Sequence, residues 1–161
     1  MRFLELKVPP PAVALLFGFL MWLASSLIAP VEVPFGPRVA IAIVLACVGL
    51  TFGISGMVSF WRARTTMNPT KPGAASSLVT AGPFRITRNP MYLSLLLYLL
   101  AWAVYLSNLL VVLFLPVFVL YMNQFQIKPE ERMLSSLFGP EYAAYQGRVP
   151  RWLCGVTPPS G

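Results

Sequence analysis

The stretch GPFRITRNPMYLSLLLYLL, residues 82–100, joins a short polar segment directly to a long apolar one. Arg85 and Arg88 precede Asn89 and Pro90, and the apolar run follows at once. Proline is favoured at the first position of a helix, and asparagine is favoured as the capping residue before it. The stretch therefore predicts a membrane helix that begins at Pro90, is capped by Asn89 and carries two cations at its start.

The composition predicts the same class of protein for the whole chain. Of the 161 residues, 57% are hydrophobic and 11% are charged, and the mean hydropathy is +0.72. Soluble domains carry about 25% charged residues, so we predict an integral membrane protein, and the length suits one domain. The net charge of +7 fits basic loops on one side of a membrane. A nucleic-acid partner is disfavoured, because the basic residues form no stripe on a soluble domain.

Few side chains in this sequence are able to do chemistry. The chain contains no histidine, two cysteines and five acidic residues. The lack of histidine excludes imidazole acid–base catalysis, histidine-ligated haem and the usual zinc sites. Cys47 and Cys154 suggest neither a disulfide framework nor a metal site, so no metal is expected. The paired carboxylates Glu130 and Glu131 are the acidic residues most suited to a binding site.

Four apolar runs predict an all-α membrane bundle that forms a single domain over residues 1–161. A helix needs about 20 apolar residues to cross the hydrocarbon core of a bilayer. A signal peptide is the alternative for the first run, but three further hydrophobic segments favour a retained helix. Ser107 and Asn108 are the only polar residues between the third and fourth runs, which predicts a tight helical hairpin. The predicted membrane helices are 12–29, 39–61, 90–106 and 109–127.

Two residue types should shape these helices. Gly49 and Gly53 are spaced four residues apart in the second run, which would let another helix approach closely. Pro116 interrupts the fourth run and should kink it.

The remaining segments are polar and predict where the chemistry lies. Residues 62–89 form a basic connector without acidic residues, and its part 68–77 is typical of a loop. Residues 128–152 predict amphipathic helices on the membrane surface, with Pro129 in the first turn and a break at Gly139. Basic residues gather on the cytosolic side of membrane proteins. We therefore expect four crossings, both termini in the cytosol, and the connector and C-terminal helices on that same face.

Two motifs on either side of the predicted hairpin are more specific. The strings LVTAGPFRITRNPMYLS and PEERMLSSLFGPEYAAYQGRVPRW together resemble the isoprenylcysteine carboxyl methyltransferase family. That family belongs with the phospholipid methyltransferases among small integral-membrane enzymes that use S-adenosylmethionine. The resemblance covers residues 60–152 and implies the same cofactor. The family usually has histidine at the position of Asn89, and many members have tyrosine at Phe84, so this chain lacks an imidazole and a hydroxyl there.

The resemblance also implies the residues that hold the cofactor. A helix N-terminus beside an arginine would receive the methionyl carboxylate. Glu130 best matches the glutamate that binds the cofactor's ammonium or ribose hydroxyls, and Glu131 would support the helix end. The alternatives are arginines that snorkel to lipid phosphates and acids that only stabilise a helix N-terminus. The implied cofactor-binding residues are Ser77, Leu78, Val79, Phe84, Arg88, Asn89, Pro90, Met91, Tyr92, Glu130 and Glu131.

The methyl acceptor is less closely defined. By the same resemblance, Gln126 occupies a substrate-side position at which carboxyl-methylating members have arginine, which counts against prenylcysteine as the acceptor. A lipophilic or small acceptor is expected at the membrane, and carboxylates, amines and thiols all remain open. Methyl transfer is an in-line displacement that depends mainly on alignment and on exclusion of water, so the absence of histidine is compatible with it.

Two other function classes fit parts of the sequence. The helical hairpin and amphipathic tail would also suit a non-catalytic membrane or lipid-binding protein of the same fold. Sterol reductases share a related C-terminal core that binds a nicotinamide cofactor, but they are much longer. A soluble Rossmann-type methyltransferase is excluded, because the chain has no glycine-rich fingerprint between a strand and a helix.

Overall fold

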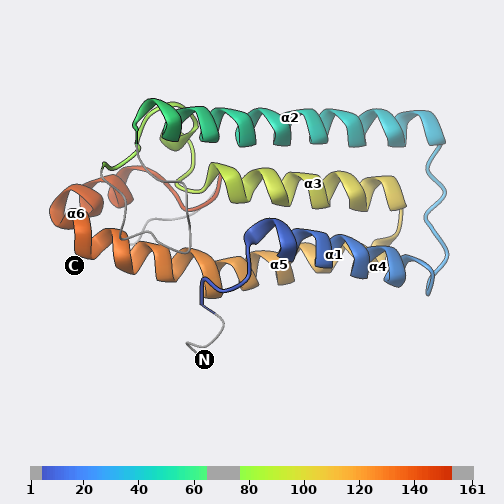
Figure 1. Ribbon diagram of the computed structural model, residues 1–161. Coiled ribbons are helices and arrows are strands. Elements are labelled where there is room, and N and C mark those ends of the chain that lie inside the picture. The colour runs from blue at the N-terminus through green and yellow to red at the C-terminus, as the bar shows by residue number, and fades with distance from the viewer. Residues whose placement is uncertain (1–4, 65–76, 154–161) are drawn as a thin grey trace.

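The computed structural model describes residues 5–64 and 77–153, and the regular structure in these ranges is helical (Figure 1). This confirms the predicted all-α class. The predicted loop 68–77 lies, up to residue 76, outside the described residues, as does Cys154. The elements are α1 (Pro10–Ser25), α2 (Phe35–Arg62), the 3-10 helix η3 (Gly82–Arg85), α3 (Pro90–Leu106), α4 (Leu109–Val112), α5 (Phe114–Met122), the π-helix η4 (Asn123–Ile127) and α6 (Lys128–Arg148).

Two helix ends differ by four residues from the sequence-based boundaries, and local chemistry explains both. α1 ends at Ser25 rather than residue 29, because the hydroxyls of Ser25 and Ser26 donate to the carbonyls of Trp22 and Leu23. Such side-chain bonds compete with the helix, and Pro30 disfavours helical backbone in the residue before it. α2 begins at Phe35 rather than residue 39, since a helix tolerates a proline such as Pro37 in its first turn.

Glycines allow α2 and α3 to pack closely in antiparallel fashion, as the Gly49/Gly53 spacing predicts. A Cβ placed on Gly49 would lie 3.2 Å from both Leu97 Cβ and the Ser94 carbonyl oxygen, and one on Gly53 would lie 3.2 Å from Ser94 Oγ. One on Gly56 would meet Met91 Cγ at the same distance. A larger residue at any of the three glycines would therefore need a shift of its neighbour, and at Gly49 that neighbour is backbone of α3.

α1 and α5 pack on α3 from the side away from α2 (Figure 1). The core between them is apolar, and Met21, Phe118 and Met122 are fully buried in it. The ring of Phe17 packs edge-on against Phe118, with ring centroids 5.4 Å apart. Because Trp102 Nε1 donates to the carbonyl of Gly18 at 3.0 Å, α1 is also fixed to α3 by a hydrogen bond.

The predicted turn at Ser107 and Asn108 joins α3 to α4 and also binds the segment after α1. Ser107 adopts left-handed backbone, with φ of 51°, and its Oγ donates to the carbonyl of Val31 at 2.8 Å. Asn108 Oδ1 caps α4 by accepting from the N–H of Leu110, while its Nδ2 donates to the carbonyl of Ile28 at 2.7 Å. Ser107 and Asn108 thus form hydrogen bonds with backbone groups of two segments at this end of the bundle.

The fourth apolar run is broken twice but remains helical throughout. The helical hydrogen-bond pattern is interrupted at Leu113, whose backbone stays in the right-handed helical region (φ −65°, ψ −20°), because Pro116 has no N–H for the Val112 carbonyl and its ring crowds that turn. α6 begins at Lys128 with Pro129 in its first turn, as predicted, but it follows the π-helix directly instead of starting a separate element. A wider π turn relieves the same conflict one turn before Pro129. Gly139, at φ 46° and ψ −119°, makes the predicted break inside α6.

Among the described residues, two helices are long and apolar enough, by length and composition, to cross a membrane. These are α2, with 28 residues and a mean hydropathy of 2.3 over an 18-residue window, and the helical segment Leu109–Arg148, with 40 residues and 1.9 over such a window. α1 and α3 are shorter apolar helices. Up to the break at Gly139 this segment is about 45 Å long, which exceeds the roughly 30 Å hydrocarbon thickness of a bilayer.

Candidate functional site

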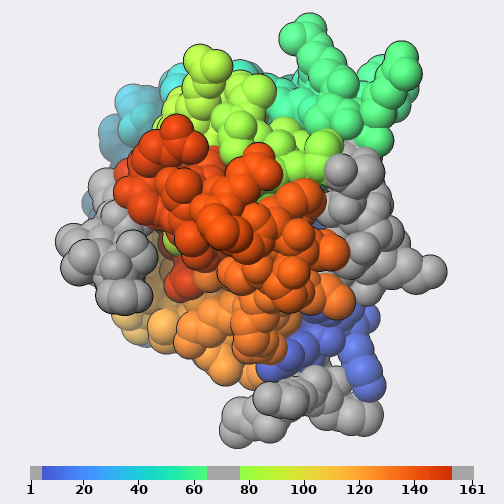
Figure 2. All heavy atoms as spheres, turned by 90° about the vertical axis from the view of Figure 1, so that its left-hand side faces the viewer, coloured from blue at the N-terminus to red at the C-terminus, as the bar shows by residue number. Residues whose placement is uncertain are grey.

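The polar residues of the second half of the chain converge at the end of the bundle where α3 begins. Figure 2 views this end, and α6 lies across its centre. The segment before α3 is fixed there by residues that follow α6. The N–H of Arg88 donates to the carbonyl of Pro150 at 2.9 Å, and Thr87 Oγ1 donates to the carbonyl of Arg151 at 3.0 Å. The connector and the last described residues thus form one layer over the start of α3.

Asn89 occupies the capping position of α3, but its side chain does not cap the helix. Instead, Asn89 Nδ2 donates to the carbonyl of Arg151 at 2.9 Å. The predicted capping role is therefore wrong, because a bond to the C-terminal segment takes the side chain. Pro90 does occupy the first helical position, as predicted. The first turn of α3 consequently keeps N–H groups that no side chain caps.

Glu131 is held by two arginines. Arg151 Nε donates to Oε1 at 3.0 Å and Arg151 Nη2 donates to Oε2 at 2.5 Å, which is a two-point contact. Arg88 Nη1 lies 3.4 Å from Oε1. The hydrogen bonds from Arg151 raise the pKa of its guanidinium. Glu131 is therefore a structural carboxylate that orients both cations.

Arg88 is buried and only partly satisfied. Its side chain is 10% exposed, and its Nε and Nη1 atoms make no hydrogen bond to any described residue. Two buried donors without acceptors cost several kcal/mol unless another group accepts from them. Beside its ion pair with Glu131, Arg88 thus keeps two donors that could bind a further anion.

Glu130 is the second buried charge of the site. Its Oε1 accepts a hydrogen bond from the hydroxyl of Tyr92 at 2.5 Å. Burial raises the pKa of the Glu130 carboxyl to about 7, against a lowering contribution from the Tyr92 hydrogen bond and a raising one from the charge of Glu131. Near neutral pH this carboxyl can therefore exist in either protonation state.

Arg88 and Glu130 line the same cavity, of about 480 Å³. α1, α2 and α3 form most of its wall, and Glu130 contributes from α6. Within the described ranges, no group of three or more acidic or cysteine side chains is placed to hold a metal ion. The lining residues are Pro9, Pro10, Pro11, Leu50, Gly53, Ile54, Met57, Phe60, Phe84, Arg88, Asn89, Pro90, Met91, Tyr92, Ser94, Leu95, Tyr98 and Glu130.

Most of the site residues implied by the sequence resemblance meet at this cavity. Those that line it are Phe84, Arg88, Asn89, Pro90, Met91, Tyr92 and Glu130. Leu78 and Val79 line a different groove, beside Arg62 on α2. Ser77 lies next to them and donates from its Oγ to the carbonyl of Ala63 at 3.2 Å. Residues 77–79 therefore do not line the cavity that contains Arg88 and Glu130.

Gln126 lies away from the cavity wall. It is fully buried in the π-helix, and its Nε2 donates to the carbonyl of Val8 at 2.8 Å. Its Oε1 makes no hydrogen bond within the described chain. A second bond, from the N–H of Leu6 to the carbonyl of Phe125, fixes the same N-terminal segment. The contacts of Gln126 are thus those of a residue that positions the segment before Pro9–Pro11, which forms part of the cavity wall.

Several residues of the site were not singled out from the sequence. Arg151 binds Glu131. Thr87 is fully buried and donates from Oγ1 to the carbonyl of Arg151. Tyr145 donates from its hydroxyl to the carbonyl of Phe84 at 2.8 Å. Burial raises the pKa of both Tyr142 and Tyr145. The second motif contains Arg151 and both tyrosines, so the motif was the signal that pointed to this region. It did not specify their partners.

Comparisons with known proteins identify a family for the chain. The phospholipid methyltransferase family model matches residues 37–141, a range that includes Arg88, Glu130 and Glu131. An uncharacterized protein of Haemophilus influenzae is 56% identical over 63 residues, which cover 39% of this chain and 100% of that protein. The cobalt-zinc-cadmium resistance protein CzcN of Cupriavidus metallidurans is 36% identical over 75 residues, 47% of this chain and 34% of that protein. No solved structure matches the chain.

Proposed function

Because the chain belongs to the phospholipid methyltransferase family, we propose that it is a membrane methyltransferase whose methyl donor, S-adenosylmethionine, binds between Arg88 and Glu130. One observation carries this proposal. A buried cation and a buried carboxyl, contributed by segments on either side of the α3–α4 turn, line one cavity.

The unpaired atoms of Arg88 fit the carboxylate of the donor's methionyl group. A guanidinium holds a carboxylate by two parallel hydrogen bonds from Nε and Nη2 or from Nη1 and Nη2. Arg88 Nε and Nη1 are buried and make no hydrogen bond within the described chain, so one of them could form such a pair together with Nη2. Glu131 leaves these donors incompletely used, since its closest contact with Arg88 is 3.4 Å. A bound carboxylate would relieve the cost of one of the two orphaned donors.

The start of α3 supports the same anion. The side chain of Asn89 is bound to the Arg151 carbonyl instead of the helix N–H groups. The N–H groups of the first turn and the positive end of the helix dipole are therefore available beside Arg88. Among the predicted residues, Met91 and Tyr92 would contribute backbone N–H groups, since Pro90 has none and the N–H of Asn89 donates to Thr87 Oγ1 at 3.2 Å; Asn89 and Pro90 would set the position of this turn.

Glu130, Tyr92 and Phe84 would contact the rest of the donor. The Glu130 carboxylate can accept from the ammonium or from the ribose hydroxyls, and Tyr92 fixes its orientation through the 2.5 Å hydrogen bond. Phe84 is buried and packs edge-on to Phe60, with ring centroids 5.3 Å apart. Aromatic faces of this kind suit an adenine ring or a sulfonium. Ser77, Leu78 and Val79 would join the site only after a movement of the connector.

When bound, the sulfonium supplies an electrophilic methyl group to a nucleophile. The chain's own residues would bind the donor, align it with the acceptor and exclude water, which are the main requirements of an in-line displacement. No histidine is needed for an acceptor that is already a carboxylate, a thiolate or a neutral amine. We propose that the acceptor is lipophilic or small and reaches the cavity from the membrane.

The distribution of basic residues supports a site on the cytosolic face. Arg62 ends α2 and Arg64 follows it, Arg88 precedes α3, and Arg148 ends α6, so all lie at the α6 end of the bundle. Arg38, in the first turns of α2, lies at the opposite end. The positive-inside rule then orients the α6 end toward the cytosol, with α1, α2, α3 and α4–α5 as four crossings.

Calorimetric titration of the detergent-solubilised protein with S-adenosylmethionine tests the proposal. Arg88→Ala should weaken binding by more than tenfold, which corresponds to at least about 1.4 kcal/mol. Arg85→Ala is the matched control, because Arg85 is an exposed arginine three residues earlier in the same segment, and it should bind like the wild type. No heat of binding in the wild type, or equal affinity in both variants, would reject the site.

A further inference from the structure

The segment before α1 docks on the same helical segment that contributes Glu130. The N–H of Leu6 donates to the carbonyl of Phe125 at 3.1 Å, and Gln126 Nε2 donates to the carbonyl of Val8 at 2.8 Å. In Figure 1 this N-terminal segment runs from the start of α1 to the junction of α5 and α6. It forms turns and no helix of its own, so bonds to a distant part of the chain hold it in place.

The carbonyl on which this segment docks is one that the sequence leaves without its usual helical partner. In an α-helix the carbonyl of Phe125 would accept from the N–H four residues later, but that residue is Pro129, which has no N–H. Leu6 supplies a donor from outside the helix at 3.1 Å. The proline that causes the π turn thus also creates a receptor for the N-terminal segment.

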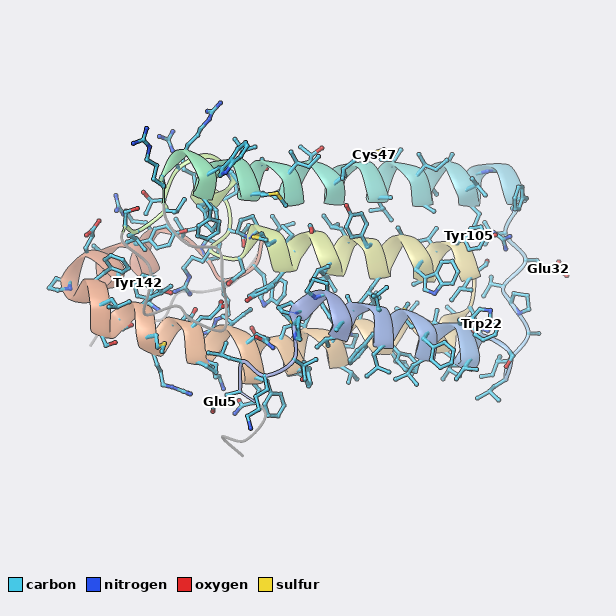
Figure 3. The ribbon with its side chains drawn as sticks, in the orientation of Figure 1. Glu5, Trp22, Glu32, Cys47, Tyr105 and Tyr142 are labelled. Carbon is cyan, nitrogen blue, oxygen red and sulfur yellow. The ribbon has the colours of Figure 1, made fainter. Side chains whose placement is uncertain are left out.

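The docked arrangement is built so that it can be released. Arg132 Nη2 donates to Glu5 Oε2 at 2.5 Å, but the Arg132 side chain is 58% exposed, so water and salt weaken this ion pair. Glu5 lies beside the junction of α5 and α6, on the side of the bundle away from α2 (Figure 3). Leu6 is held in left-handed backbone, with φ of 56°, which is strained for a residue other than glycine. Gln126 Oε1 is buried without a hydrogen bond in the described chain.

The residues that follow the docked segment form one wall of the cavity. Pro9, Pro10 and Pro11 line it together with Arg88 and Glu130. Proline fixes its backbone φ angle, so three prolines in succession form a stiff connection between Val8 and α1. A displacement at Val8 would therefore move the cavity wall instead of being absorbed by the chain between them.

We propose that residues 5–8 form a strap that closes the cavity on its α1 side, and that its release from Phe125 and Arg132 admits a water-soluble ligand. The identity of that ligand, the methyl donor, rests on the proposed function, whereas the strap can be tested without it. The alternative is a fixed anchor that only stabilises the fold. The two differ in whether breaking the exposed ion pair between Glu5 and Arg132 makes the cavity interior accessible.

The experiment measures how fast iodoacetamide, a small neutral reagent, modifies a single thiol inside the cavity of the full chain in nanodiscs. Ser94→Cys supplies the thiol, because Ser94 is buried and lines this cavity. Cys47 and Cys154 are replaced by serine. Arg132→Glu places a second carboxylate against Glu5, and it should raise the modification rate by about threefold, the effect expected for an exposed ion pair.

Two further variants separate the ion pair from a general effect of charge. Glu5→Arg in the Arg132→Glu protein restores an opposite pair and should restore the slow modification. Arg148→Glu is the matched control, because Arg148 is an exposed arginine of the same helix, far from Glu5 in the sequence, and it should react like the wild type. Added salt should speed modification in the wild type and slow it in Arg132→Glu, since salt screens an attraction in one and a repulsion in the other.

The outcomes distinguish the strap from the proposed function. Equal modification rates in the wild type, Arg132→Glu and Arg148→Glu would show a fixed anchor and overturn the inference. The association rate of S-adenosylmethionine, measured by stopped-flow fluorescence, should rise in Arg132→Glu by the same factor as thiol modification. An unchanged association rate beside faster modification would show that the donor enters elsewhere and would overturn the strap's role in entry. Faster modification in Arg132→Glu with no donor binding in any protein would support the strap and reject the proposed function.

Discussion

The hydroxyl of Tyr92 donates a hydrogen bond of 2.5 Å to Glu130, 38 residues later in the sequence, and so joins the start of α3 to the start of α6. The neighbouring Glu131 is bound by Arg151 at two points and is near Arg88. Two adjacent carboxylates thus have different environments. Glu131 is neutralised by cations, whereas Glu130 has a hydroxyl partner and faces the cavity.

The raised pKa of Glu130 predicts a stability cost at neutral and higher pH. The folded carboxyl titrates at about 7 and the ordinary value is 4.5, so the folded protein keeps a proton that the unfolded chain loses between these values. The free energy of unfolding of the cofactor-free protein should therefore fall as the pH rises from 4.5 to 7, by up to about 3 kcal/mol.

Glu130→Gln should remove this cost, since the amide has no charge to desolvate and its oxygen can still accept from Tyr92. At pH 8 we expect the cofactor-free variant to melt at a higher temperature than the wild type, and to bind S-adenosylmethionine at least tenfold more weakly. Thermal denaturation across pH, together with calorimetry, checks both. A variant that melts lower than the wild type at pH 8 would contradict the assigned burial of the carboxyl.

Asn89 offers a test of its observed role against the capping role expected from the sequence. Because Asn89 Nδ2 is a donor to the Arg151 carbonyl, Asn89→Asp should place a carboxylate against that carbonyl and destabilise the protein by more than Asn89→Ala, which should cost about 1 kcal/mol. For a helix cap the order is reversed, since aspartate caps well and alanine poorly. Denaturation of the three proteins at pH 7 gives the order directly.

Gln126 should matter for stability and not for acceptor binding. Gln126→Leu removes the hydrogen bond to the Val8 carbonyl, and we expect a loss of about 1–2 kcal/mol in the free energy of unfolding. Once an acceptor is known, its KM should change less than about twofold, because the side chain lies outside the cavity wall. A large rise in KM with unchanged stability would restore the substrate-binding role that the sequence resemblance implies.

The contact between α2 and α3 predicts a contrast between two glycines of the same helix. Gly49→Ala would place a methyl group 3.2 Å from the Ser94 carbonyl oxygen and from Leu97 Cβ, and overpacking of this kind costs about 1–3 kcal/mol. Gly36→Ala meets nothing within 4 Å and should stabilise the helix by about 0.5–1 kcal/mol. Opposite shifts in melting temperature are expected, and equal shifts would argue against close packing at Gly49.

The fold could be predicted from the sequence wherever a single local rule decides the backbone. α3 begins at Pro90 and ends at Leu106 as predicted, because proline fixes the start and Ser107 and Asn108 interrupt the apolar run. The Gly49/Gly53 spacing and the break at Gly139 also followed from residue type alone. The π-helix could not be predicted. Pro129 has no N–H for the carbonyl one turn earlier, and a helix end, a kink or a π turn would each accommodate this, so residue type does not select one of them.

The sequence indicated residues of the candidate site better than it indicated the partners that these residues bind. Arg88 and Glu130 were implied by motifs on either side of the hairpin, and they line one cavity. Asn89 was assigned to the wrong partner, because the competing acceptor, the Arg151 carbonyl, lies 62 residues away and no local pattern reveals it. The 77–79 segment was assigned by resemblance alone, and the structure places Leu78 and Val79 in another groove.

The bonds from residues 87–89 to Pro150 and Arg151 have a consequence for biosynthesis. Chains emerge at roughly 5–20 residues per second, so α3 waits several seconds, already within reach of the bilayer, before its polar start finds these partners. During that interval Arg88 and Asn89 must rely on water or lipid phosphates. Assembly of this layer is thus among the final events of folding, and a chaperone or insertase that shields the nascent α3 would act before the layer exists.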